Sequence, residues 1–298
     1  MKSRSTIKWA ALFSISQEGK YDARMEKERL DVLLVKRNLA ETREKAKRMI
    51  MAGLVFSDNE RLDKPGMKVD TDIPLHVKET LKYVSRGGYK LEKALDVFST
   101  SIKDKIVVDI GASTGGFTDC ALQNGAKLVY AIDVGYNQLA WKIRSDERVI
   151  VKERTNFRYA TKALFAKGLP NYATIDVSFI SLRLILPVLK TVLADNSEVI
   201  ALVKPQFEAE RHQVGKKGVI RDPDIHKNVL KKVVSFAVAE GYTFRDLTFS
   251  PITGGEGNIE YLLHLGWKLK AENDDVDGYH ELDERITTVV EEAHRTLK

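Results

Sequence analysis

The sequence predicts an α/β protein, with a large domain on an open, mostly parallel seven-stranded sheet and a small α+β domain before it. Apolar strand-like runs alternate with helical segments over residues 106–203, which is typical of a parallel sheet with helices on both faces. Two further strand-like runs, 242–252 and 258–267, are separated by TGGEG alone. Because five residues cannot hold a crossover helix, these runs are predicted to form an antiparallel hairpin.

Composition limits the functional classes. The chain has 298 residues, enough for one large and one small domain, and its net charge of +6 favours a polyanionic partner without requiring one. The single cysteine, Cys120, excludes an internal disulfide framework and fits a reducing compartment, so a cytoplasmic protein is expected. No apolar run approaches the roughly 20 residues of a membrane span. Neither membrane association nor a bound metal is expected, and no oligomeric state is predicted.

The first residues form a separate part of the chain. Residues 1–24 combine basic residues with a short apolar patch but lack a convincing signal-peptide cleavage site. They are expected to be an extension, disordered or left over from expression. A small domain follows over residues 25–82. It begins with a helix that has Leu30, Leu33 and Leu34 on one face.

A second helix of the small domain is strongly basic. Thr42 is placed to cap it and Gly53 to close it, and the turn signals Asp58-Asn59 and Pro65-Gly66 then separate short strands. Four of the seven residues from 42 to 48 are basic, namely Arg43, Lys45, Lys47 and Arg48. Such a face is often merely solvated, and this helix alone leaves that interpretation open. However, residues 26–80 as a whole resemble the S4 RNA-binding domain. The resemblance implies phosphate contacts from these four residues and from Arg29.

The boundaries of the large domain follow from glycines and apolar stripes. Residues 83–89 are expected to form an interdomain linker, because Gly87-Gly88 loosens the backbone before a helix, and Arg86 within it is expected to contact RNA. The large domain is predicted over residues 90–267, with parallel strands at 106–110, 128–133, 149–151, 172–177 and 198–203. Residues 268–298 read as an acidic segment and a C-terminal helix, whose apolar stripe is Ile286, Val289, Val290, Ala293 and Leu297.

The stretch VVDIGASTGGFTD, residues 107–119, allows three chemistries. It contains the G-x-S-x-G of a hydrolase nucleophile elbow around Ser113, but none of the later histidines (His212, His226, His264, His280) stands in a setting that marks it as the base. A dinucleotide fingerprint fits poorly, because it needs glycine at position 113. A nucleoside-type cofactor such as S-adenosylmethionine fits better, since Asp133 lies 22 residues beyond Gly111, where its carboxylate can accept ribose hydroxyls. Alternatively, the glycines merely permit a tight turn.

Polar residues at strand ends carry the remaining chemistry. Asp176 and Lys204 each end a predicted strand, Glu260 lies in the last strand, and Lys90 opens the first helix of the large domain. Ligands of open parallel sheets bind beyond the carboxyl ends of the strands, so these side chains are expected to face one site. An ion-pair network without catalytic function is the alternative.

Several motifs together resemble one family. They are SRGGYKLEKAL, DIGASTGGFTDCAL, AIDVGYNQL, DVSFISL, LVKPQFE and GNIEYLLHL. These resemble TlyA-type proteins, often labelled hemolysins, which join an S4 domain to a Rossmann-like methyltransferase domain of the FtsJ/RrmJ class. The resemblance implies S-adenosylmethionine-dependent 2′-O-methylation of cytidine in ribosomal RNA, with ribosomal RNA or ribosomal subunits as partners. It also implies a catalytic tetrad of Lys90, Asp176, Lys204 and Glu260.

The expected cofactor and catalytic roles can be assigned by residue. The cofactor-binding residues are expected to be Asp109, Gly111, Ser113, Gly115, Gly116, Phe117, Asp133 and Asp176. An ordinary lysine, with a pKa of about 10.4, is protonated at neutral pH, and a second nearby cation disfavours that charge. This effect does not decide which of Lys90 and Lys204 is the base. The hypothesis chosen is Lys204, with Asp176 orienting it and with Lys90 and Glu260 positioning the ribose and tuning the charge. A non-catalytic RNA-binding assembly factor and a lytic protein are the alternatives.

Overall fold

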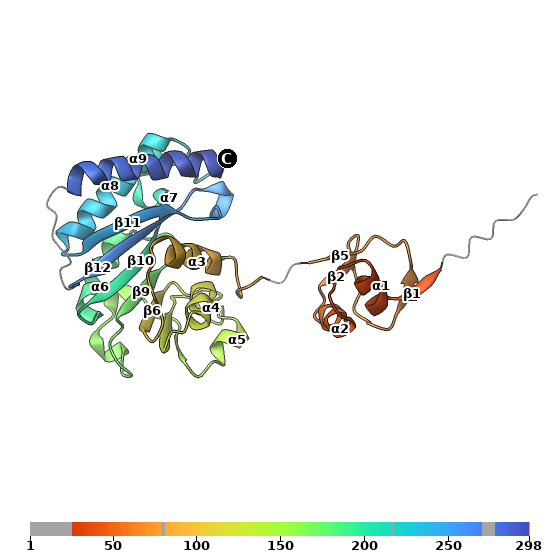
Figure 1. Cartoon of the computed structure of the whole chain (residues 1–298). Coiled ribbons are helices and arrows are strands. Elements are labelled where there is room, and N and C mark those ends of the chain that lie inside the picture. The colour runs from red at the N-terminus through yellow and green to blue at the C-terminus, as the bar shows by residue number, and fades with distance from the viewer. Residues whose placement is uncertain (1–25, 79–80, 216, 270–277, 298) are drawn as a thin grey trace, which may run out of the picture. The chain divides into compact units, whose positions relative to one another are not determined.

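The computed structural model describes residues 26–78, 81–215, 217–269 and 278–297, and for 278–280 the backbone alone. The chain divides into two compact units, residues 1–80 and 81–298 (Figure 1). The buried apolar side chains of the two units form separate clusters. The expected N-terminal extension lies outside the described residues, as does most of the acidic segment, residues 270–277.

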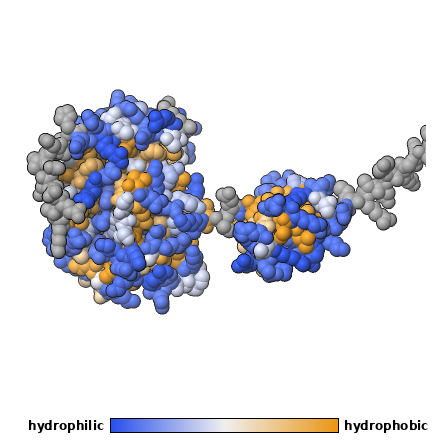
Figure 2. All heavy atoms as spheres, viewed as in Figure 1, coloured by the Kyte–Doolittle hydropathy of each residue, from blue (hydrophilic) through white to orange (hydrophobic). Residues whose placement is uncertain are grey.

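The small unit packs two helices against short strands. Its elements are α1 (Leu30–Lys36), α2 (Arg43–Met51), an antiparallel pair of β1 (Lys27–Arg29) with β4 (Lys68–Asp70), and β2 (Val55–Ser57) paired with β3 (Glu60–Arg61) and β5 (His76–Val77). As predicted, Thr42 caps α2, because its hydroxyl accepts the Lys45 N–H at 3.2 Å. Apolar residues also gather on the face of this unit seen in Figure 2, with polar residues around them.

The large unit contains the predicted seven-stranded sheet. The strands, in spatial order, are β11 (Thr243–Phe249), β12 (Tyr261–Trp267), β10 (Ser197–Val203), β9 (Tyr172–Ile175), β6 (Ile106–Ile110), β7 (Leu128–Ile132) and β8 (Val149–Lys152). All neighbours are parallel except β12, which is antiparallel to both β10 and β11. The predicted α/β class and terminal hairpin are therefore confirmed.

Helices cover both faces of the sheet (Figure 1). One face packs against α3 (Gly87–Val97), α4 (Gly116–Gln123) and α5 (Trp141–Arg144), and the other against α6 (Leu186–Val192), α8 (Pro223–Ala239) and α9 (Gly278–Thr296). Successive side chains of a strand point to opposite faces of the sheet. In β6, Val107 packs in the core under α3 and α4, and Val108 packs in the core under α6, α8 and α9. A short helix, α7 (Pro205–Glu208), follows β10 directly.

Residues 83–89 differ from the expected linker. The side chain of Tyr83 is buried in the core of the large unit, and the Val84 N–H donates to the Asp119 carboxylate at 2.9 Å. Helix α3 already begins at Gly87. A Cβ on Gly88 would lie 2.3 Å from the Tyr83 ring, so this glycine permits close packing rather than a loose joint. This segment therefore belongs to the large unit.

The C-terminal helix also belongs to the large unit, although the domain was expected to end at residue 267. The apolar stripe predicted for this helix is buried: Ile286, Val289, Val290 and Ala293 join the same core as the sheet. Figure 1 shows α9 lying along α8 and β11. Sequence periodicity predicted the stripe but did not identify its partners.

A buried histidine cluster ties α9 to the sheet and predicts acid sensitivity. His226 on α8 lies 2.8 Å from the Tyr261 hydroxyl and 3.0 Å from His294 Nε2, and burial, with a smaller contribution from His294, lowers the His226 pKa to about 4. In the unfolded chain His226 takes up a proton near pH 6.5, whereas in the folded chain His226 stays neutral until about pH 4. Unfolding is therefore favoured as pH falls between these values, by up to about 3 kcal/mol.

Urea denaturation at pH 7 and pH 4.5 measures this loss as a difference between variants. The comparison is needed because burial raises the pKa of Asp109 to about 6, and that shift changes stability in the opposite direction as pH falls. His226→Gln should lose less stability on acidification than wild type, whereas the exposed control His212→Gln should behave as wild type. Equal losses in all three proteins would contradict the assignment.

Candidate active site

The site lies where the strand order reverses. Strands β6 and β9 are neighbours although β7 and β8 separate them in the chain, and such a reversal opens a crevice at the carboxyl ends of the strands. Two adjoining cavities occupy this edge, one of about 640 Å³ and one of about 480 Å³. Both are lined by Gly111, Ser113 and Asp176. The edge can therefore hold a ligand that extends from one cavity into the next.

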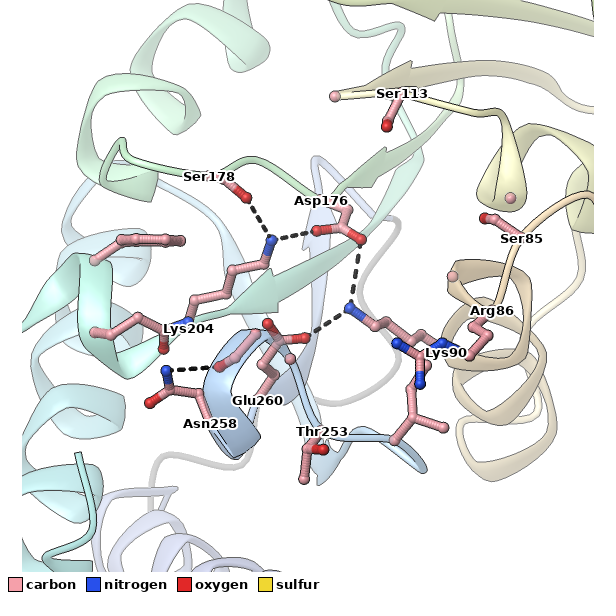
Figure 3. Close-up of a pocket in the computed structure, with 18 of the residues that line it drawn as sticks. Ser85, Arg86, Lys90, Ser113, Asp176, Ser178, Lys204, Thr253, Asn258 and Glu260 are labelled. Atoms are coloured by element: carbon pink, nitrogen blue, oxygen red, sulfur yellow. Dashed lines mark hydrogen bonds and ion pairs between the residues drawn. The ribbon is translucent and has the colours of Figure 1, made fainter. Parts of the chain in front are cut away.

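The four predicted catalytic residues meet in the larger cavity (Figure 3). Lys204 Nζ donates to Asp176 Oδ1 at 2.6 Å, and Lys90 Nζ donates to Glu260 Oε2 at 2.6 Å. Lys90 Nζ also lies 3.6 Å from Asp176 Oδ2, which joins the two pairs. Asp176 follows β9, Lys204 is the N-cap of α7, Lys90 lies in α3, and Glu260 directly precedes β12. Two lysine side chains and two carboxyl side chains thus form one continuous chain of contacts.

Lys90 carries a stable positive charge. Burial alone would lower its pKa, but the carboxylates of Asp176 and Glu260 outweigh burial and raise the pKa above the ordinary lysine value. The expectation that two neighbouring lysines would depress one lysine pKa is therefore not met at Lys90, because the two carboxylates that it contacts raise its pKa. Lys90 is suited to hold charge and position, and not to accept a proton.

The glycine turn shapes both cavities. Gly111 has φ +87°, and a Cβ there would lie 2.3 Å from the Asp176 carbonyl oxygen. A Cβ on Gly116 would lie 2.3 Å from Ser85 Oγ. Gly115 has φ +100° and immediately precedes α4, but it lines neither cavity. Phe117 lines the larger cavity. The glycines therefore do more than permit a turn, since they let the loops that form the crevice approach one another.

Asp133 is held ready for a polar ligand in the smaller cavity. Its Oδ2 accepts the Ser113 N–H at 2.8 Å and its Oδ1 accepts the Gly135 N–H at 2.7 Å. Each oxygen retains a second lone pair, so the fixed carboxylate can accept two further hydrogen bonds. This donor and acceptor set, beside a turn that excludes a Cβ at Gly111, fits the vicinal hydroxyls of a ribose.

Asp109, which was expected to help bind the cofactor, lies behind the cavities and not in their walls. Its carboxylate accepts the hydroxyls of Thr118 at 2.6 Å and Thr174 at 3.0 Å, and the side chain lines neither cavity. Asp109 is buried between α4 and the sheet, where its contacts with Thr118 and Thr174 hold these two elements together behind the glycine turn. A hydrolase nucleophile at Ser113 would need a histidine base beside it. Among the described residues Ser113 has no hydrogen bond to a histidine, which argues against the hydrolase interpretation.

The basic face of α2 is partly neutralised. Arg29 and Arg43 both bind the buried Asp31, and the Arg29 hydrogen bond contributes most to lowering the Asp31 pKa to about 2. Lys45 pairs with Glu41 at 2.9 Å, and Lys47 pairs with Glu44 at 2.7 Å. Arg48 is exposed on the same helix, while Arg86 lines the larger cavity of the other unit. The candidate RNA contacts are therefore distributed over both units.

Sequence reasoning missed two features of the crevice. Ser178 accepts a hydrogen bond from Lys204 Nζ at 3.0 Å. Phe179, 91% exposed, stands beside Phe207 with ring centroids 4.9 Å apart. Both Ser178 and Phe179 belong to DVSF, which directly follows β9, so their position at a strand end was the available signal.

Comparison with known proteins identifies relatives of both units. The FtsJ-like methyltransferase family matches residues 83–267, and the S4 domain matches residues 28–72. The chain is 68% identical to "Putative rRNA methyltransferase YqxC" of Bacillus subtilis (strain 168), over 91% of this chain and 96% of that protein. It is 41% identical to "16S/23S rRNA (cytidine-2'-O)-methyltransferase TlyA" of Mycobacterium tuberculosis (strain ATCC 25618 / H37Rv), over 80% and 89%. A solved structure, "Putative hemolysin from Streptococcus thermophilus", is 56% identical, with a TM-score of 0.68 over 91% and 97%.

Proposed function

Because this chain belongs to the FtsJ-like methyltransferase family and carries an S4 domain, we propose that it methylates the ribose 2′-hydroxyl of cytidine in ribosomal RNA. The observation that carries the proposal is the contact chain of Lys90, Asp176, Lys204 and Glu260 in one cavity. A relative named for this cytidine 2′-O-methylation supports the choice of substrate. The site of action is then the cytoplasm, on ribosomal RNA or ribosomal subunits.

S-adenosylmethionine is the methyl donor of this enzyme class, and its sulfonium supplies an activated methyl group whose transfer leaves a neutral thioether. In this chain, Asp133 would hold the ribose hydroxyls, and the turn from Gly111 to Phe117 would pass along the rest of the cofactor. Asp176 borders both cavities, so this member of the tetrad also faces the smaller cavity, which Asp133 lines.

The tetrad supplies the proton acceptor. A 2′-hydroxyl becomes a good nucleophile as its proton is removed, and Lys204, in its neutral form, takes that proton on Nζ while the new O–C bond forms and the S–C bond breaks. Asp176 orients the amine and stabilises the ammonium that results. Lys90 and Glu260, held together at 2.6 Å, fix the far side of Asp176. The proton on Lys204 is finally released to water.

Cofactor binding is expected to depend on Asp133 separately from RNA binding. Asp133→Ala removes the two ribose acceptors, so the Kd for S-adenosylmethionine should rise by about 10- to 100-fold, the loss of one or two charge-assisted hydrogen bonds. The Kd for ribosomal RNA should stay near that of wild type. Calorimetry with the cofactor and a filter-binding assay with RNA make the comparison. An equal collapse of both affinities would contradict the assignment.

RNA binding is expected to use the α2 face. Replacing Arg43, Lys45, Lys47 and Arg48 with Gln should weaken RNA binding and flatten its dependence on salt, by about one unit of slope for each lost phosphate contact. The surface ion pairs of Lys45 and Lys47 do not prevent this, since such pairs contribute little energy. Titration of RNA at several salt concentrations measures the slope. An unchanged slope would remove this face from the interface.

Two alternative functions have less support. A non-catalytic assembly factor would not need the complete tetrad, and measurable cofactor binding without any methyl transfer to ribosomal RNA would be needed to favour it. A lytic role rests on the hemolysin label alone. Among the described residues, no helix is both long and apolar enough to cross a membrane.

A further inference from the structure

Ser178 is the feature of the crevice that the tetrad does not explain. It lies two residues beyond Asp176, in the loop that leaves β9, and it lines both cavities. Its hydroxyl accepts a hydrogen bond from Lys204 Nζ at 3.0 Å, while Asp176 Oδ1 accepts another at 2.6 Å (Figure 3). Lys204 is therefore held by two acceptors from one short loop.

The stereochemistry of an amine gives these two acceptors a consequence. The nitrogen of a lysine has three positions around it besides its bond to Cε, and in the neutral form two of them are N–H donors and the third is a lone pair. When Asp176 and Ser178 each accept one N–H, the lone pair is confined to the third position. A single acceptor would leave the amine free to rotate about the Cε–Nζ bond, with the lone pair in either of the two remaining positions.

We propose that Ser178 is a positioning residue that fixes the direction of the Lys204 lone pair toward the 2′-hydroxyl. This inference rests on the proposed role of Lys204 as the proton acceptor. Asp176 alone cannot fix the direction of the lone pair, because it accepts from Lys204 through Oδ1 only. Its other oxygen, Oδ2, lies 3.6 Å from Lys90 Nζ. Lys90 cannot replace Lys204 as the proton acceptor, since its Nζ already contacts two carboxylates. Ser178 thus converts an amine with the right chemistry into one with the right orientation.

The direct test compares Ser178→Ala with Ser178→Thr in full-length protein, using ribosomal RNA and S-adenosylmethionine. A misdirected base should lower kcat about 10- to 100-fold in Ser178→Ala, because small errors of orientation cost that much. The KM for RNA and the Kd for S-adenosylmethionine should not change. Ser178→Thr retains the hydroxyl and should recover most of the rate. Thr191→Ala, which removes an exposed hydroxyl on α6, is the control and should match wild type.

A double variant separates positioning from other roles. Ser178→Ala added to Lys204→Ala should cause no further loss in single-turnover rate, because the group that Ser178 positions is already absent. An additive loss would overturn the proposal, as would wild-type kcat in Ser178→Ala or a change confined to KM. Identifying the methylated nucleoside in the wild-type reaction tests the proposed function separately. Methyl groups on a base would refute that function, whereas the rates of the Ser178 variants test the positioning role.

Discussion

Lys204→Ala is expected to lower methyl transfer by about 10²- to 10⁴-fold, the usual contribution of a general base. The reason is that Lys204 is the tetrad lysine whose Nζ contacts a single carboxylate, Asp176, whereas Lys90 is held between two. S-adenosylmethionine should still bind, because the Asp133 carboxylate and the glycine turn are unaffected. Single-turnover transfer to ribosomal RNA and calorimetry with the cofactor measure the two quantities.

The control for this variant is Lys190→Ala on α6. Lys190 pairs with Glu240 at 2.7 Å away from both cavities, so its removal takes away a lysine without changing the site. The Lys190 variant should transfer methyl groups at the wild-type rate. If Lys204→Ala keeps more than about a tenth of wild-type turnover, Lys204 is not the base.

Glu260→Ala is expected to affect both stability and activity. The Lys90–Glu260 pair is almost fully buried, with the two residues 7% and 2% exposed, and removing one partner of such a pair costs about 3 kcal/mol or more. Lys90 would then compete with Lys204 for Asp176, so kcat should also fall by about 10- to 100-fold. Urea denaturation and single-turnover transfer measure the two effects.

Two further variants separate charge from bulk at this position. Glu260→Gln keeps the size of the side chain but not its charge, and it should lose kcat nearly as severely as Glu260→Ala. Glu147→Ala removes an exposed carboxylate outside the site and should leave stability and kcat unchanged. If Glu260→Gln retained wild-type kcat, the charge of Glu260 would have no part in holding the tetrad.

The sequence was most informative where parallel strands end. The carboxyl ends of neighbouring parallel strands meet at one edge, so Asp176 and Lys204 had to lie near the turn at Gly111. The pairing within the tetrad was less accessible. Which carboxylate each lysine contacts depends on the approach of α3 to β12, and no local pattern encodes that approach.

Other differences come from tertiary packing. Asp109 resembled a ligand-binding carboxylate by position, but Thr118 and Thr174 enclose it from two separate elements. The basic face of α2 was predicted from its spacing, whereas its ion pair with Asp31 required the fold of the small unit. Residues 83–89 were predicted to be a linker because they contain two glycines, but the buried side chain of Tyr83 anchors this segment to the large unit.

The most direct test of the central claim is nucleoside analysis after methyl transfer in vitro. Purified full-length protein is incubated with methyl-labelled S-adenosylmethionine and ribosomal RNA from cells that lack the protein, and the RNA is digested to nucleosides. The account predicts that the label appears in 2′-O-methylcytidine and disappears when Lys204→Ala replaces wild type. Label in a base-methylated nucleoside, or equal labelling by the Lys204 variant, would contradict it.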